Sequence, residues 1–443
     1  MGGLTAARVL ASRFERVTVL ERDELPDDGQ ERRGVPQAGH AHALLTKGRL
    51  ELEALFPGFT RDLLAGGAVR FDAGRDTLFY QLGRPRVRFF SDHPLITMSR
   101  PFLERTLRGR VRALPGVEIR ERTAVAGLTG DAGRVTGVLT ARGETVDADL
   151  VVDATGHSTH RTDRWLQALG CPPPQVSSVR IDVGYTTRLY WRTDAMERLA
   201  DGAFAYASTG MPPHDKRAAA VAPIEDGRWI VTLGGWHRAN APADVAGFAD
   251  FAARLPSPHI ARLLSTAEPV HDGTARRYSA PTARRRHFER LGAPPAGYAA
   301  LGDAVCTFNP LYGQGMTLAI LQAVELGRCL DRHGTAEEMT REHFRNVARI
   351  VDLPWRMSTE SDLMFPETVG HRPRGLAARA WYTRQVLLAS HVSERVHRDL
   401  LRVTSLVAAP SALFDPLGVL RILWAARRSP ARRAGFDARE VRV

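Results

Sequence analysis

The chain has 443 residues, of which 44% are hydrophobic and 25% are charged, which is ordinary for a globular enzyme and excludes a disordered or fibrous protein. The net charge of +12 comes mostly from scattered arginines, with Lys47 and Lys216 as the lysines. Because no zinc-finger spacing or RNA-binding motif accompanies them, we expect no nucleic-acid partner.

No apolar run reaches the roughly 20 residues that a transmembrane helix needs, so we expect no transmembrane segment. The three cysteines, Cys171, Cys306 and Cys329, lie far apart and form no CxxC pair. We therefore expect neither a metal site nor a disulfide framework, and a reducing, cytoplasmic location.

The first residues have the pattern of half a βαβ unit. The stretch from Gly3 to Phe14 predicts a short helix, and Val17 to Leu20 predicts a buried parallel strand that ends at Glu21. An acidic residue at such a strand end can accept hydrogen bonds from both hydroxyls of a ribose. We therefore predict a dinucleotide site that includes Gly3, Glu21 and its neighbour Arg22.

A complete dinucleotide-binding unit also needs a first strand and a Gly-x-Gly-x-x-Gly turn before its helix. Here Met1-Gly2-Gly3 stands directly before the helix, and Gly3 fits the last glycine of that turn. We expect Met1 to be an internal methionine, preceded in the native protein by about ten or more residues. The alternative is a degenerate gene whose product binds its cofactor weakly.

Later segments predict further strands and then helices. Apolar, β-branched patterns predict strands at 117–120 and 123–129, and a hairpin of 135–141 with 144–152 that is joined by a glycine turn. The same kind of pattern at 179–187 and 219–234 predicts a second sheet. After Gly315 the pattern is helical to the end of the chain.

The strongest motif is Gly302-Asp303 followed by Pro310-Leu311-Tyr312-Gly313-Gln314-Gly315-Met316. An apolar lead-in predicts a strand that delivers Asp303, whose carboxylate can accept from a ribityl or ribose hydroxyl. The glycines allow close approach to a flat or phosphorylated ligand, and the following helix offers free N–H groups and a positive dipole end. A plain glycine-rich turn before a helix is the alternative.

This motif, completed by Ala319, resembles the single-component flavoprotein monooxygenases, the p-hydroxybenzoate hydroxylase superfamily. The resemblance covers nearly the whole chain and implies FAD as the cofactor. It places Asp303 near the FAD pyrophosphate and ribityl chain. It places Pro310, Gly313, Gln314, Gly315 and Met316 at the pyrimidine side of the isoalloxazine.

A second motif, Asp153-Ala154-Thr155-Gly156, follows a predicted strand and resembles the same family. The resemblance implies cofactor contacts for Asp153 and Gly156, and for Ala124 and Val125 on the strand before it. The family has an Asp-Gly pair where this chain has Thr155-Gly156, and this departure weakens the case for NADPH binding.

The third motif, Ser99 to Glu104, opens a helix, and the resemblance places Arg100 at the FAD pyrophosphate. The alternative is an exposed arginine beside a helix-capping Ser99.

The segment 32–42, Arg-Arg-Gly-Val-Pro-Gln-Ala-Gly-His-Ala-His, resembles the flavin-dependent epoxidases of polyether antibiotic pathways. The segments 223–229 and 309–313 resemble them as well. The resemblance implies that Arg33 covers the FAD phosphates and that Gln37 lies near the flavin. For His40 and His42 we expect hydrogen-bonded loop positions, with covalent flavin attachment as an alternative.

We therefore predict an α/β (α+β) fold with a Rossmann-like FAD-binding domain, an interleaved antiparallel-sheet substrate domain and C-terminal helices. The FAD-binding domain is expected at 1–75, 96–175 and 288–345, with its first strand missing. The substrate domain is expected at 76–95 and 176–287, and the helical region at 346–443.

The predicted function is an FAD-dependent monooxygenase that inserts one oxygen atom of O2 through a flavin C4a-hydroperoxide, epoxidising or hydroxylating an apolar small molecule of secondary metabolism. The flavin carries the chemistry, so no catalytic side chain is assigned. NADPH or NADH is the expected electron donor, and the protein is expected to be a monomer or homodimer. The alternatives are a reductase of the geranylgeranyl reductase type and a flavin-free binding scaffold.

Overall fold

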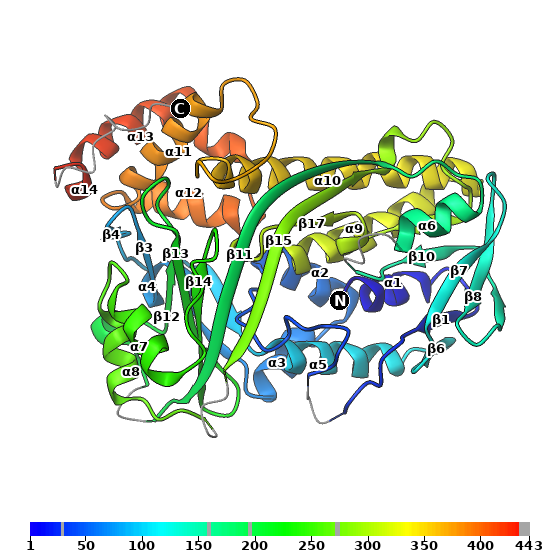
Figure 1. Cartoon of the computed structure of the whole chain (residues 1–443), viewed down its shortest axis with the longest axis horizontal. Helices are drawn as coiled ribbons and strands as arrows, with labels where there is room; N and C mark the ends of the chain where they lie inside the picture. Colours follow the sequence, from blue (N-terminus) through cyan, green and yellow to red (C-terminus); the bar gives the residue numbers. More distant parts are fainter. Residues whose placement is uncertain (28–30, 157–160, 194–196, 271–274, 434–443) are drawn as a thin grey trace.

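The computed structural model describes residues 1–27, 31–156, 161–193, 197–270 and 275–433. Figure 1 shows helices and short strands on one side of the molecule and a large sheet on the other, with C-terminal helices beside that sheet. Each side contains segments that lie far apart in the sequence, so the chain passes between the two sides several times.

The parallel strands of the first side form two pairs. β1 (Val17–Leu20) pairs with β6 (Val117–Arg120), and β10 (Val151–Asp153) pairs with β16 (Tyr298–Ala300). The Rossmann-like part therefore consists of two separate two-stranded sheets among the described residues. In a parallel pair, alternate residues direct their backbone N–H and C=O groups to one neighbouring strand, and the residues between them direct theirs to the other side. Because β1 and β10 each have one partner strand, each keeps one edge that no described strand covers.

A separate antiparallel sheet contains β7 (Val125–Gly130), β8 (Val135–Thr140) and β9 (Thr145–Asp147). The predicted hairpin 135–141 with 144–152 is correct only for its first part. β9 ends at Asp147, and Val151–Asp153 belongs to another sheet because it pairs with β16. Sequence patterns near 144–152 do not reveal this pairing, since β16 lies more than a hundred residues later in the chain.

Helices pack against these strands. α5 begins at a cap, where the Ser99 hydroxyl accepts from the Phe102 N–H at 3.3 Å. α1 and α9 approach closely at Gly327, where an added Cβ would lie 2.6 Å from Val9 Cγ1. The helices of this side are α1 (Gly2–Leu10), α2 (Thr46–Leu55), α3 (Phe59–Ala65), α5 (Arg100–Arg112), α6 (Arg161–Ala168) and α9 (Gly315–Arg332).

The large sheet has eight strands in the order β17-β15-β11-β14-β13-β12-β3-β4. All neighbours are antiparallel except β12 and β3. Figure 1 shows the long strands β11 and β15 curving from this sheet across to the first side. The strands are β3 (Thr77–Gln81), β4 (Arg84–Pro85), β11 (Gln175–Trp191), β12 (Ala205–Ser208), β13 (Arg217–Ile224), β14 (Arg228–Gly235), β15 (Arg276–His287) and β17 (Cys306–Thr307).

Further helices cover this sheet and complete the chain. α7 (Val245–Ala253) and α8 (His259–Thr266) bury Phe248 and Ile260 against strand residues such as Val221. The later helices are α10 (Ala336–Asp362), α11 (Leu376–Ala389), α12 (Glu394–Thr404), α13 (Pro416–Arg428) and α14 (Pro430–Arg433). The short 3-10 turns are η2 (Ala200–Gly202), η3 (Phe288–Arg290), η4 (Gly302–Ala304), η5 (Pro310–Tyr312) and η6 (Pro410–Leu413). No described helix is long and apolar enough to cross a membrane.

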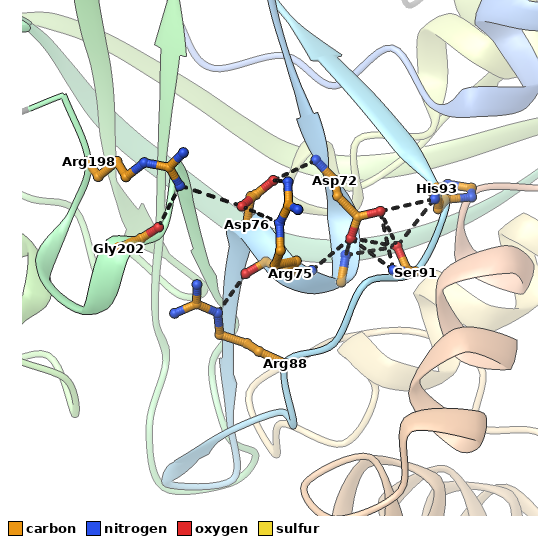
Figure 2. A network of polar contacts seen from close by, with 9 residues as sticks. Asp72, Arg75, Asp76, Arg88, Ser91, His93, Arg198 and Gly202 are labelled. Carbon is orange, nitrogen blue, oxygen red and sulfur yellow. Dashed lines mark hydrogen bonds and ion pairs between the residues drawn. The ribbon is translucent and has the colours of Figure 1, made fainter.

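A network of buried polar groups fixes the region between β2 (Val69–Asp72), α4 (Ala73–Asp76) and β5 (Pro94–Thr97) (Figure 2). The Asp72 carboxylate caps α4 by accepting from the Arg75 N–H at 2.8 Å, and it also accepts from the Ser91 N–H at 3.0 Å. Burial opposes ionisation of Asp72, but these backbone hydrogen bonds outweigh it and lower its pKa. The segment before β5 is therefore held against the end of β2 and the start of α4.

A second buried carboxylate joins α10 to the large sheet and to η5. Asp362 is 0% exposed, and its Oδ1 accepts from Trp236 Nε1 at 2.7 Å, Asn309 Nδ2 at 2.7 Å and the Tyr312 hydroxyl at 3.1 Å. Its Oδ2 has no hydrogen-bond partner within the described ranges. Burial raises the pKa of Asp362 to about 6, although the three hydrogen bonds act in the opposite direction.

The raised pKa of Asp362 predicts a pH-dependent stability. The folded carboxyl holds its proton more firmly than the unfolded one, whose pKa is 3.8, so its contribution is fully present below that value and is lost as pH rises through about 6. Asparagine cannot ionise. We expect the unfolding free energy of Asp362→Asn to gain about 2–3 kcal/mol relative to the native chain between about pH 4 and pH 7.

Urea denaturation at a series of pH values measures this difference. The exposed Asp250→Asn is the matched control, and its difference from the native chain should stay constant with pH. A constant difference for Asp362→Asn as well would contradict the prediction.

Candidate functional site

One continuous cavity of about 2150 Å³ extends through both sides of the molecule. Its first part, which we call the helix branch, is lined by α1, β1, β10, the start of α5 and the segment 301–316. Its second part, the sheet branch, is lined by β2, β3, β5, β12, β13 and α12, together with Arg86. The two branches meet near Tyr185 and Tyr278, which pack with Leu311 and Tyr312.

Charged side chains gather in the helix branch. Arg32 bonds Glu21 through Nη1 at 2.8 Å and Glu104 through Nε at 2.9 Å, and Arg100 reaches Glu104 at 3.3 Å. Burial alone would raise the pKa of Glu104, but the chain's amino group and then Arg100 and Arg32 lower it to about 2. Arg100 is 9% exposed, and its buried Nε has no hydrogen-bond partner among the described residues. The branch therefore presents paired arginines with donor capacity left over.

Glu21 lies directly after β1, as expected for a ribose-binding acid. Its Oε2 is paired with Arg32, and its Oε1 accepts from the Asp23 N–H at 3.1 Å. A carboxylate has about four acceptor positions. Glu21 can therefore still accept from the two hydroxyls of a diol.

Asp153, at the end of β10, already has a full set of partners. Its Oδ1 accepts from the Thr155 N–H at 3.0 Å and the Thr155 hydroxyl at 2.7 Å. Its Oδ2 accepts from Thr162 at 2.6 Å and Tyr298 at 3.1 Å. The Asp153 carboxylate thus organises the strand end, although the residue also lines the cavity.

The Gly302-Asp303 turn follows β16. Gly302 has a φ of +65°, a conformation that favours glycine, and its N–H donates to Gln322 Oε1 at 2.8 Å. This turn brings Asp303 to the cavity wall. The arrangement agrees with the predicted strand that delivers this carboxylate.

The glycine loop then leads into α9. Gly313 has a φ of +65°, and α9 begins at Gly315 without a side-chain cap. The buried Gln314 Oε1 has no hydrogen-bond partner in the part of the chain that the structure describes. A Cβ added at Gly315 would find Asp303 Oδ1 as its nearest atom, at 4.0 Å. The uncapped N–H groups and the positive dipole end of α9 therefore face open cavity.

Two histidines, the buried His40 and the half-buried His42, lie near the place where the branches meet. His40 Nδ1 bonds the Thr187 hydroxyl at 2.8 Å, and its ring lies edge-on to Tyr185 at 4.7 Å between centroids. His42 Nδ1 donates to the His40 carbonyl at 2.8 Å and lines the cavity. Burial lowers the pKa of His40 to about 3 and that of His42 to about 4, so both rings are neutral at neutral pH.

All but one of the predicted cofactor-binding residues line this cavity. Those that line it are Gly3, Glu21, Arg22, Gln37, Arg100, Ala124, Val125, Asp153, Gly156, Asp303, Pro310, Gly313, Gln314, Gly315 and Met316. The exception is Arg33, whose neighbour Arg32 lines the cavity instead. Sequence reasoning missed Arg32 and Glu104. The spacing of Arg100 and Glu104 on a predicted helix was the available signal for Glu104.

These features fit FAD, which carries a pyrophosphate, ribose and ribityl hydroxyls and a flat ring system. The arginines suit the pyrophosphate, and the carboxylates after β1 and β16 suit the hydroxyls. The orphaned Arg100 Nε and Gln314 Oε1 are buried polar atoms that a polar ligand would satisfy. The open space at Gly315 leaves room for a ring beside the α9 terminus.

Comparison with solved structures shows the fold. A variant of 2-methyl-3-hydroxypyridine-5-carboxylic acid oxygenase has a TM-score of 0.63 at 19% identity, covering 97% of this chain and 95% of that one. PqsL of Pseudomonas aeruginosa, described as a probable FAD-dependent monooxygenase, has a TM-score of 0.57 at 20% identity over 82% of this chain and 95% of that one. The Diels-Alderase PyrE3 has a TM-score of 0.56 at 21% identity, covering 92% of this chain and 79% of that one.

Comparison with known sequences shows the family. Protein Rv3254 of Mycobacterium tuberculosis (strain ATCC 25618 / H37Rv) is 32% identical over 385 residues, which are 82% of this chain and 79% of that protein. The family model for FAD dependent oxidoreductases matches residues 103–326, just over half of the chain. The chain therefore belongs to the FAD dependent oxidoreductase family and is an FAD-dependent enzyme with the fold of the flavin monooxygenases.

Proposed function

We propose that this enzyme is a monooxygenase that transfers one oxygen atom of O2 to an apolar small molecule of secondary metabolism, as an epoxidation or a hydroxylation. NADPH or NADH is the proposed electron donor. The observation that carries the proposal is the continuity of the cavity, whose helix branch fits FAD and whose sheet branch meets it at the segment 309–316. When bound, FAD supplies the redox chemistry and the activation of O2.

In this proposal the residues of the helix branch bind and orient the cofactor. Asp303 accepts from a ribityl hydroxyl, Glu21 accepts from the ribose, and Arg100 donates to the pyrophosphate. The uncapped N–H groups of α9 after Gln314 face the flavin and stabilise negative charge on its pyrimidine edge.

The sheet branch keeps water away from the substrate. Its lining includes Phe71, Phe79 and Leu95 and a row of alanines on β12 and β13. The described lining residues on β2, β3, β5, β12, β13 and α12 are uncharged, and Arg86 is the charged side chain beside them. An apolar wall of this kind suits an apolar substrate and limits hydrolysis of reactive species.

Isotope labelling tests the reaction. The FAD-loaded chain, supplied with NADPH and an unsaturated apolar substrate under ¹⁸O₂, should yield a product that contains one labelled oxygen atom. Mass analysis of the product reads this directly. A product that gains hydrogen and no label would identify a reductase of the geranylgeranyl type and overturn the proposal.

The role of Asp303 predicts weaker cofactor binding in Asp303→Ala. A hydrogen bond to a charged group contributes about 1.5–3 kcal/mol, so FAD should bind about 10- to 100-fold more weakly. Flavin content after dialysis, read from absorbance, measures the change. Asp331→Ala, at an exposed acid paired with Arg13, is the control, and equal flavin retention in the two variants would count against Asp303.

Gly315→Val tests whether the glycine loop faces the flavin. The nearest protein atom to an added Cβ is Asp303 Oδ1, at an uncrowded 4.0 Å, so the variant should fold with a melting temperature within a few degrees of the native apoprotein. Its side chain would fill space that the ring needs, so we expect at least a tenfold loss of FAD affinity, about 1.4 kcal/mol or more.

Gly109→Val is the matched control, because Gly109 is also helical and also has open space around its Cβ. It should retain FAD fully. Native FAD affinity in Gly315→Val would remove this loop from the cofactor site.

A further inference from the structure

The sheet branch has a smooth floor of small side chains. Cross-strand register places Thr187, Thr232, Ala220, Ala207 and Phe79 in one row on the face that the cavity follows. Apart from Phe79 at its end, this row carries hydroxyl and methyl groups. The floor is therefore long and, apart from Phe79, carries only small side chains without charge.

The two ends of this floor differ in character. One end is β15, whose Tyr278 lies near the segment 309–316, and the other is β3, which carries Phe79 and Gln81. β15 and β3 are separated by five steps in the strand order. At about 4.8 Å per step these ends lie roughly 24 Å apart.

Arg86 stands at the β3 end. It is 8% exposed, its Nε donates to Gln81 Oε1 at 3.1 Å, and its guanidinium lies 4.8 Å from the centre of the Phe79 ring. Nη2 also donates to Gln81 Oε1, and Nη1 makes no hydrogen bond within the described part of the chain. The Gln81 amide and the Phe79 ring are both neutral, so the charge of Arg86 has no counter-ion among these contacts.

Neighbouring arginines are paired differently. Arg75 bonds the Asp76 carboxylate at 2.9 Å, and Arg198 lies 3.6 Å from the same carboxylate (Figure 2). Arg88 donates to the Arg75 carbonyl at 2.6 Å. The nearby Asp72 is occupied by backbone N–H groups and Ser91. The acids of this region thus have other partners, and none of them bonds Arg86.

The buried histidines near Arg86 do not balance its charge either. Burial, and after it the positive charge of Arg86, lower the pKa of His397 to about 3. Burial lowers the pKa of His391 to about 4, and Arg86 adds to this effect. Burial also lowers the pKa of Arg86 to about 9, so the guanidinium remains charged at neutral pH.

A buried charge without a partner is unfavourable by several kcal/mol in general and is retained where a ligand supplies the opposite charge. We propose that Arg86 binds the carboxylate of an elongated apolar substrate whose other end reaches the segment 309–316. The inference rests on the proposed function in one respect, which is that the end of the substrate near the segment 309–316 is the end that reacts. One guanidinium matches the single charge of a carboxylate, and its planar fork suits that group.

Ligand binding tests the proposal without turnover. The probes are linoleic acid and linoleyl alcohol, which share one unsaturated chain and differ in the charged head group. Isothermal titration into the FAD-loaded chain without NADPH should show the acid binding at least tenfold more tightly than the alcohol. Arg86→Met should lose this preference, and Arg86→Lys, which keeps the charge, should retain part of it.

Arg84→Met is the matched control, because Arg84 is exposed on β4 two residues away. It should prefer the acid as strongly as the native chain does. An equal affinity of the native chain for acid and alcohol, a preserved preference in Arg86→Met, or no binding of either probe would overturn the proposal.

The melting temperature without ligand gives a second reading. Removing an uncompensated buried charge should raise it, so Arg86→Met should melt above the native chain, whereas a fall would show a stabilising partner for Arg86. A failure of oxygen labelling with the acid preference intact would overturn the monooxygenase and leave the carboxylate site standing. Labelled product with no preference for the acid would support the monooxygenase and overturn the carboxylate site.

Discussion

The position of the glycine loop at 309–316 relative to the large sheet depends on the buried carboxylate of Asp362. A single oxygen atom accepts from Trp236 beyond β14, from Asn309 before η5 and from Tyr312 within η5. The left-handed turn at Gly313 and the start of α9 come directly afterwards. Because α10, the sheet and the loop share this oxygen, the uncapped helix end and the sheet branch hold a fixed relation to each other.

The parts of the fold that sequence predicts well are those whose evidence is local. β1, β6 and the cap of α5 at Ser99 coincide with the predicted bounds. An apolar run or a helix cap consists of a few consecutive residues, so the sequence alone can identify it. The segment 144–152 shows the limit. Its composition favours one continuous strand, but Val151–Asp153 pairs with Tyr298–Ala300, a contact that no local pattern encodes.

The same division applies to the site. Asp303, Gly313 and Gly315 form one contiguous motif, and the structure brings all three to the cavity. Arg32 and Arg33 are adjacent in an irregular loop, where sequence offers no period that tells which side chain turns inward. Arg86 could not be singled out at all among 61 basic residues, because its distinguishing property is the lack of a counter-ion in the folded chain.

The edges of β1 and β10 that no described strand covers face the cavity, so a ligand there meets backbone groups as well as side chains. The register turns the backbone groups of Thr18, Leu20 and Val152 away from their partner strands, and all three residues line the cavity. Two-stranded sheets are weak by themselves, so a ligand that binds only the folded chain shifts the folding equilibrium by mass action. The melting temperature of the described fold should therefore rise when a ligand fills the helix branch.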